Sequence, residues 1–229
     1  MKTAIVTGAS GNMGQAVVRK FLREGFMVIG TIVPNDPVTI DIEDPRFEKV
    51  IVNLMDEDNS LQFAESVIRK YKSIDVAVLT VGGFAMGSVA DTRTGDIMKQ
   101  YKLNFETAYN MARPAFVQML KQNSGRIFMI GSKPGLDAIY GKGLAAYGLA
   151  KSLIFRLANI MNDEAKGSNV VTSVVVPSTI DTPQNRKSMP DTNPAIWVKA
   201  EAIADIIYYY CTDDAAALRE PVIKIYNNA

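Results

Sequence analysis

Seven short apolar runs, rich in β-branched residues, recur along the chain with amphipathic stretches between them. Each run is short enough for a strand and almost continuously apolar, which is typical of strands buried on both faces of a parallel sheet. These predicted strands are Ala4–Thr7, Met27–Val33, Lys49–Leu54, Val76–Val81, Arg126–Ile130, Val170–Val176 and Val222–Tyr226. The intervening stretches predict helices over Asn12–Glu24, Asp58–Tyr71, Gly95–Gln122, Ala145–Ala165 and Val198–Thr212.

The alternation of strand and helix over the whole length predicts an α/β fold, in which one doubly wound parallel sheet carries helices on both faces. No repeat, low-complexity tract or linker interrupts the pattern, so we expect a single domain over residues 1–229. Two polar loops contain prolines, Pro34–Pro45 and Pro177–Pro194. The second is long for a compact domain, and we expect a substrate lid around residues 177–197.

The amino-acid composition excludes several kinds of catalytic site and binding partner. The 229 residues include one cysteine and no histidine, which excludes Ser-His-Asp and Cys-His catalysis and any histidine-ligated zinc site, and we predict no metal. The net charge of +1 gives no indication of nucleic acid or an anionic membrane as a partner. The single thiol and the lack of a secretory signal or a long apolar run favour the cytoplasm.

A glycine-rich turn joins the first predicted strand to the first predicted helix. Glycines at these points allow a sharp bend and let a pyrophosphate approach the backbone, while the helix start offers free N–H groups to the anion. The sequence therefore predicts a dinucleotide site, and the location between strand and helix supports it more than the glycines alone. The residues expected to form it are Gly8, Ser10, Gly11, Asn12, Met13 and Gly14.

The end of the second predicted strand is expected to distinguish NAD from NADP. An acidic side chain there would bind the ribose diol of NAD, and an arginine would bind the 2′-phosphate of NADP. The expected position is Ile32 or Val33, and neither is charged. The loop that follows carries Asp36 and further acids, which favour NADH over NADPH, although these acids also fit a solvated loop.

Tyr147 and Lys151 lie one helical turn apart on one predicted face. A nearby ammonium favours the phenolate and lowers the pKa of a phenol, so we expect Tyr147 to exchange a proton near neutral pH. Ser132 ends the fifth predicted strand, where open α/β sheets place their binding crevice. Asn104 stands inside a predicted helix, where we expect it to hold a water or a helix bulge behind the Tyr–Lys pair, or to be a plain surface amide.

These residues in this order resemble the short-chain dehydrogenase/reductase family across the whole chain. The resemblance implies a seven-stranded Rossmann-like sheet of order 3-2-1-4-5-6-7, with NAD or NADP as cofactor. It implies Tyr147 as general acid, Lys151 on the nicotinamide ribose, Ser132 on the substrate and Asn104 in a proton relay. Further expected cofactor residues are Asn53, Leu54, Gly82, Gly83, Pro177, Ile180 and Thr182.

A narrower resemblance is to dihydropteridine reductases, which reduce quinonoid dihydropterin. It rests on the lid stretch from Asp181 to Asp191 and on Gly82-Gly83-Phe84. Ser132 and Asn104 depart from that pattern, so a carbonyl or 3-oxoacyl ketone reductase remains an alternative. A non-catalytic dinucleotide sensor is the second alternative.

The expected substrate is a small molecule in contact with Phe84, Tyr140 and Trp197, since aromatic faces suit a flat ring. Trp197 alternatively packs the lid against the body of the protein. The family resemblance also implies a homodimer or homotetramer through the helices around Gly95–Gln122 and Ala145–Ala165.

Overall fold

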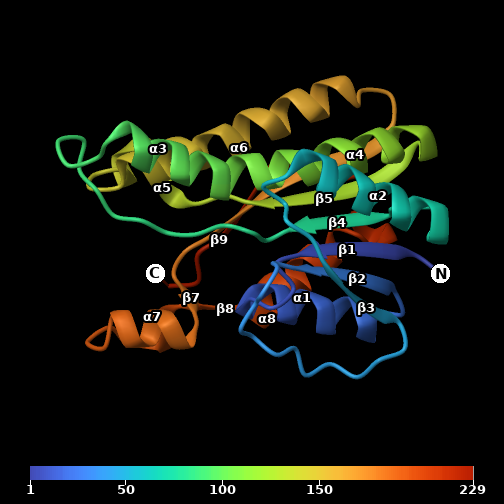
Figure 1. Cartoon of the computed structure of the whole chain (residues 1–229), viewed down its shortest axis with the longest axis horizontal. Coiled ribbons are helices and arrows are strands. Elements are labelled where there is room, and N and C mark those ends of the chain that lie inside the picture. Colours follow the sequence, from blue (N-terminus) through green and yellow to red (C-terminus); the bar gives the residue numbers. More distant parts are fainter. Residues whose placement is uncertain (229) are drawn as a thin grey trace.

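A parallel sheet of seven strands forms the centre of the protein in a computed structural model, which describes residues 1–228 (Figure 1). Its order is β3-β2-β1-β4-β5-β6-β9, so the predicted order of the seven main strands is confirmed. The strands are β1 (Thr3–Thr7), β2 (Met27–Ile32), β3 (Phe47–Ile51), β4 (Val76–Leu79), β5 (Ser124–Ile130), β6 (Asn169–Pro177) and β9 (Val222–Ile225). Strand order reverses between β1 and β4, and a binding crevice is expected outside the carboxyl ends of the strands at that point.

Helices cover both faces of the sheet, as Figure 1 shows. One face carries α1 (Asn12–Arg23) and α8 (Ala200–Tyr209), which bury Phe21 and Ile203 against β1 and its neighbours. The opposite face carries α2 (Glu57–Tyr71), α4 (Thr107–Gln122) and α6 (Ala145–Glu164). The fully buried apolar side chains of both layers explain why the strand sequences lack the polar alternation of a sheet with one face in water.

The predicted long helix over Gly95–Gln122 is interrupted. It consists of α3 (Thr94–Tyr101), a π-helical turn (Lys102–Glu106) and α4. Such π turns insert one extra residue into a helix and often occur at functional sites. Asn104 lies at the centre of this turn, as the expectation of a helix bulge anticipated.

Short elements surround the crevice. They are α5 (Lys133–Leu136), a 3₁₀ turn (Ala138–Tyr140), β7 (Ile180–Asp181), α7 (Pro183–Ser188), a second 3₁₀ turn (Pro194–Ile196) and β8 (Val198–Lys199). A third 3₁₀ turn, Asp213–Ala215, follows α8. Strands β7 and β8 pair in parallel and form the base of the segment expected to be the lid. Within residues 1–228, no helix has the length and apolarity needed to cross a bilayer.

Candidate active site

Close contact between backbone atoms shapes the turn between β1 and α1. Gly8 adopts a left-handed conformation with φ of 61°. A Cβ on Gly14 would lie 2.1 Å from the carbonyl oxygen of Gly8, so only glycine fits there. The N-cap residue of α1, Gly11, has no side chain to satisfy the first N–H groups of the helix. A glycine turn followed by an uncapped helix start fits the pyrophosphate of a dinucleotide.

A cavity of about 450 Å³ extends from this turn along the carboxyl ends of β1 to β4. Ten of the expected cofactor residues line it: Gly8, Ser10, Gly11, Asn12, Met13, Gly14, Asn53, Leu54, Gly82 and Thr182. Gly83, Lys151, Pro177 and Ile180 are not among its lining residues. The cavity thus brings together most of the expected cofactor residues, from four separate stretches of the chain.

Asp36 lies in the wall of this cavity together with Ile32 and Val33. The hydroxyl of Ser10 donates a hydrogen bond to its Oδ2 atom, and the backbone N–H of Val38 donates to Oδ1 at 2.9 Å. These bonds lower the pKa of Asp36, the Ser10 bond most, and keep the carboxylate charged. The acid is therefore present in the crevice, although it lies beyond the strand end where we expected the selecting side chain.

Tyr147, Lys151 and Ser132 come together at the next part of the crevice. Ser132 lies two residues after β5 and caps α5, accepting a hydrogen bond from the N–H of Gly135 at 3.2 Å. The Ser132 hydroxyl lies close enough to Tyr147 to lower the pKa of its phenol. Lys151 lies one turn later on α6, where it is 4% exposed and donates from Nζ to the carbonyl oxygen of Ile130 at 2.8 Å.

The expected effect of Lys151 on Tyr147 is wrong in this structure. Burial raises the pKa of Tyr147, and the hydrogen bond with Ser132 opposes that rise only in part. Nζ of Lys151 donates to the Ile130 carbonyl, and burial and Ser132 are the groups that set the direction of the Tyr147 pKa shift. Burial instead lowers the pKa of Lys151 itself to about 8. At neutral pH the pair is therefore a phenol beside a buried ammonium that loses its charge in mildly alkaline solution.

Asn104 is buried and fixes the backbone beside the Tyr–Lys pair. Its Oδ1 accepts from the N–H of Gly83 at 3.1 Å, and its Nδ2 donates to the Gly83 carbonyl at 3.0 Å. Nδ2 also donates to Oε1 of Gln100 at 2.8 Å. A Cβ on Gly82 would lie 2.7 Å from Asn104 Oδ1 and 3.1 Å from Lys151 Nζ. The absence of a side chain at Gly82 therefore leaves room for the Asn104 amide and the Lys151 ammonium beside the crevice.

Gln100 was missed by the sequence reasoning. It is 4% exposed and stands one turn before Asn104. A buried glutamine needs a hydrogen-bond partner, and the four-residue spacing to Asn104 offered the signal that could have identified one.

The three expected substrate residues occupy different surroundings. The ring of Phe84 packs edge-on against that of Tyr147, with centroids 5.2 Å apart. Tyr140 lies on the 3₁₀ turn after α5, with its ring 5.9 Å from Nζ of Lys133. Trp197 is buried and lines a separate cavity of about 600 Å³ beneath the lid segment, so the structure supports its packing alternative.

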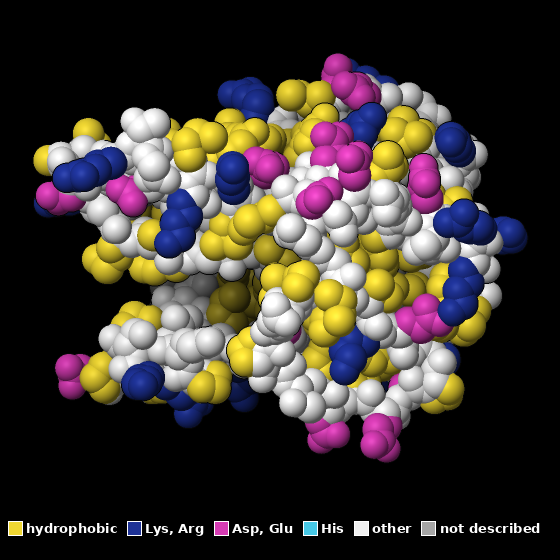
Figure 2. Space-filling model, viewed as in Figure 1, with side chains coloured by type: hydrophobic (Ala, Val, Ile, Leu, Met, Phe, Trp, Pro, Cys, Tyr) yellow, Lys and Arg dark blue, Asp and Glu magenta, His cyan; other side chains and the backbone are white. Residues whose placement is uncertain are grey.

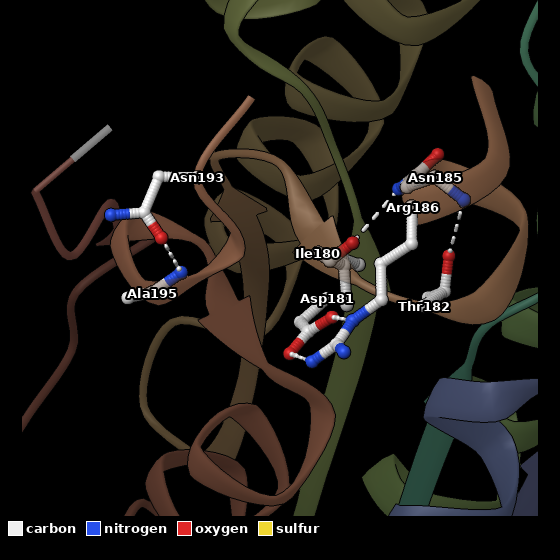
Figure 3. Close-up of polar contacts among 7 residues, drawn as sticks. All are labelled: Ile180, Asp181, Thr182, Asn185, Arg186, Asn193 and Ala195. Carbon is white, nitrogen blue, oxygen red and sulfur yellow. Dashed lines mark hydrogen bonds and ion pairs between the residues drawn. The ribbon is translucent and has the colours of Figure 1, made fainter. Parts of the chain in front are cut away.

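The lid segment is ordered by its own polar contacts, several of which appear in Figure 3. Arg186 forms a two-pronged ion pair with Asp181, at 2.6 and 2.8 Å. Thr182 caps α7 by accepting from the N–H of Asn185 at 3.1 Å. Nδ2 of Asn12, on the glycine turn, donates to Oε1 of Gln184 at 3.3 Å, which connects the segment to the cofactor cavity.

Comparison with known proteins identifies the family. The short chain dehydrogenase model matches residues 2–193. The chain is 24% identical to the 3-oxoacyl-(acyl-carrier-protein) reductase FabG of Thermotoga maritima, over 98% of this chain and 96% of that protein. It is 26% identical to the acetoacetyl-CoA reductase of an Acinetobacter strain, over 80% of this chain and 75% of that protein.

The fold is also shared with a solved structure, the ligand-free aldohexose dehydrogenase of Thermoplasma acidophilum. The TM-score is 0.84 at 21% identity, covering 99% of this chain and 93% of the other. The two relatives named above are oxoacyl reductases, so the narrower resemblance to dihydropteridine reductases is not supported. Given the family match, the glycine turn and the reductase relatives, the protein belongs to the short-chain dehydrogenases and is an NAD(P)-dependent oxidoreductase.

Proposed function

We propose that the protein is an NADH-dependent reductase of a ketone, with Tyr147 as the general acid. The observation that carries this proposal is the position of Tyr147, Ser132 and Lys151 directly beyond Gly82, where the dinucleotide cavity ends. The two oxoacyl reductases among the relatives support a ketone as the substrate.

Each polar group has a distinct task in this proposal. When bound, the nicotinamide supplies the hydride. The raised pKa of Tyr147 keeps its hydroxyl protonated at neutral pH, so that it can donate a proton to the substrate oxygen. Ser132 hydrogen-bonds the same oxygen and orients it, while the buried charge of Lys151 stabilises negative charge left on the phenol oxygen. Asn104 and Gln100 hold the backbone at Gly82 and Gly83 in position.

Asp36 supports NADH as the preferred cofactor. Its carboxylate lies in the cavity wall and engages the Ser10 hydroxyl, which removes that donor from a 2′-phosphate and adds a like charge. A hydroxyl on the ribose of NADH can instead donate to the carboxylate.

Quinonoid dihydropterin is the second candidate substrate. The observation in its favour is the Phe84 ring beside Tyr147, which offers an aromatic edge to a flat heterocycle. The oxoacyl reductases among the relatives favour the ketone. The family match and the reductase relatives argue against a non-catalytic sensor.

The remaining expectations belong to the same proposal. We expect one domain in which residues 177–197 act as a lid, tethered to the glycine turn through Gln184. Exposed apolar side chains on α4 and α6 fit a homodimer or homotetramer: Tyr109, Val117, Leu120, Leu149, Leu153 and Ile160. The single thiol is consistent with a reducing compartment such as the cytoplasm.

The test is consumption of NADH and of NADPH with two substrates, the 3-oxobutanoyl thioester of N-acetylcysteamine and quinonoid dihydropterin. We expect turnover of the thioester and faster turnover with NADH. Turnover of the dihydropterin alone would reverse the substrate assignment. No turnover of either substrate, with NADH binding intact by titration calorimetry, would overturn the proposed reaction.

A further inference from the structure

The loop that follows β4 exposes large apolar side chains to solvent. Phe84, Met86 and Val89 are 64%, 80% and 85% exposed. No residue from Thr80 to Ala90 is charged. Single exposed apolar residues need no explanation, but a row of them on one uncharged loop marks a binding surface.

A second loop adds to this surface. Ile139 is 74% exposed and Tyr140 is 47% exposed, both on the 3₁₀ turn after α5. An isolated β-bridge between Gly87 and Leu144 joins the two loops. Its hydrogen bonds run from Gly87 N–H to the Gly143 carbonyl at 2.8 Å and from Ala145 N–H to the Gly87 carbonyl at 3.0 Å. We call Phe84, Met86, Val89, Ile139 and Tyr140 the apolar shelf.

The shelf is held in shape by local bonds. Both the N–H and the hydroxyl of Thr92 donate to the Ser88 carbonyl, at 3.0 and 2.6 Å. A Cβ on Gly87 would lie 2.7 Å from Oγ1 of Thr92, so the turn is closely packed at that point. A preorganised apolar surface binds a ligand without first losing the entropy of a disordered loop.

The shelf is continuous with the reacting groups. Phe84 contacts the Tyr147 ring, and the β-bridge ends at Ala145, the first residue of α6, which also carries Tyr147. Figure 2 shows a deep hollow between α7 and the elements above it, α3 and α5, with hydrophobic side chains on both walls. A substrate bound at Tyr147 therefore meets the exposed apolar ring of Phe84 beside it.

From these observations we infer that the apolar shelf binds an aliphatic chain attached to the ketone. This inference rests on the proposed function and adds the substrate class: a 3-oxoacyl thioester with a medium-length chain, in preference to a sugar or a short polar ketone. The five shelf side chains would cover the chain methylenes, while Tyr147 addresses the carbonyl. Each methylene that leaves water for such a surface raises kcat/KM by about fourfold.

The test is a chain-length series of N-acetylcysteamine thioesters: 3-oxobutanoyl, 3-oxohexanoyl and 3-oxooctanoyl. For the native enzyme we expect kcat/KM to rise steeply along the series. Met86→Ser and Val89→Ser should lower kcat/KM most for 3-oxooctanoyl and least for 3-oxobutanoyl, so that the rise flattens, and Met86→Leu should preserve the rise. Leu61→Ser, on α2 and away from the crevice, is the matched control and should behave as the native enzyme.

Three outcomes would overturn the inference. One is a kcat/KM that does not change with chain length in the native enzyme. That result leaves the proposed ketone reduction intact, because the short thioester still turns over. Another is an unchanged slope in both serine variants. The last is a loss of oligomeric mass in Met86→Ser on sedimentation, which would assign the shelf to a second copy of the chain. Absence of turnover with every thioester would instead count against the proposed function.

Discussion

The two halves of the crevice are built in different ways. The cofactor half depends on main-chain geometry: a left-handed Gly8, the close approach of Gly14 to it, and an uncapped helix start. The substrate half depends on side chains carried by loops that only long-range contacts bring together, such as the bridge between Gly87 and Leu144. The comparison teaches that the part serving a common cofactor tolerates little change of backbone, while the part that selects a substrate is set by exchangeable side chains.

The largest expected effect is a loss of turnover at Tyr147, which lies between the cofactor half and the substrate half of the crevice. Tyr147→Phe removes the proton donor and keeps the ring that Phe84 contacts. We expect turnover of the ketone to fall by roughly 10²–10⁴-fold. The affinity for NADH, measured by calorimetry, should stay within about twofold of the native value, because the change leaves the cavity lining intact.

The backbone dependence of the cofactor half is tested by Gly14→Ala. The added methyl group meets a carbonyl oxygen that cannot move aside, and overpacking of this kind costs roughly 1–3 kcal/mol. NADH affinity should weaken correspondingly, by about 5- to 150-fold. Gly95→Ala is the matched control, since its Cβ would meet nothing within 4 Å and the residue does not line the cofactor cavity. Equal affinities in the two variants would count against the close-approach argument.

A side-chain effect within the cofactor half is expected at Asp36. Asp36→Ser removes the carboxylate that engages Ser10, so the ratio of kcat/KM for NADPH to that for NADH should rise by about tenfold as a like-charge repulsion disappears. Asp41→Asn, on the same loop and absent from the cavity lining, should leave the ratio unchanged. If both variants behave alike, Asp36 does not select the cofactor.

The smallest effect concerns stability. The folded pKa of Lys151, about 8, lies below its ordinary value of 10.5, so the unfolded chain binds the extra proton between these values. Stability contributed through this group therefore rises with pH across that window and is lowest below it. Lys151→Met should have a higher Tm than the native protein at pH 7, and the difference should shrink toward pH 10. A native protein that is the more stable of the two at pH 7 would contradict this account.

Much of the fold was predictable because its signals are local. Continuous apolar runs predict buried parallel strands wherever they occur, and the glycine turn of Gly8 to Gly14 needs only its neighbours to be recognised. Asp36 was harder to place, since it reaches Ser10 through a loop without regular structure. No periodic pattern fixes how such a loop folds back.

The sequence predicts which residues form the candidate site better than it predicts their pKa values. The spacing of Tyr147 and Lys151 correctly places both on one helix, but not the direction in which the ammonium points. That direction is set by the Ile130 carbonyl, a partner distant in sequence, and burial is the main cause of the raised pKa of Tyr147. Trp197 is similar: its burial depends on the packing of the lid segment, which no short motif encodes.

The most direct test of the central claim is a crystal structure with NADH and a 3-oxoacyl thioester bound. The account predicts the diphosphate over the turn from Gly8 to Gly14 and the nicotinamide beyond Gly82. It predicts the Tyr147 hydroxyl within hydrogen-bond reach of the substrate ketone. A dinucleotide bound elsewhere, or a ketone oxygen facing away from Tyr147 and Ser132, would contradict it.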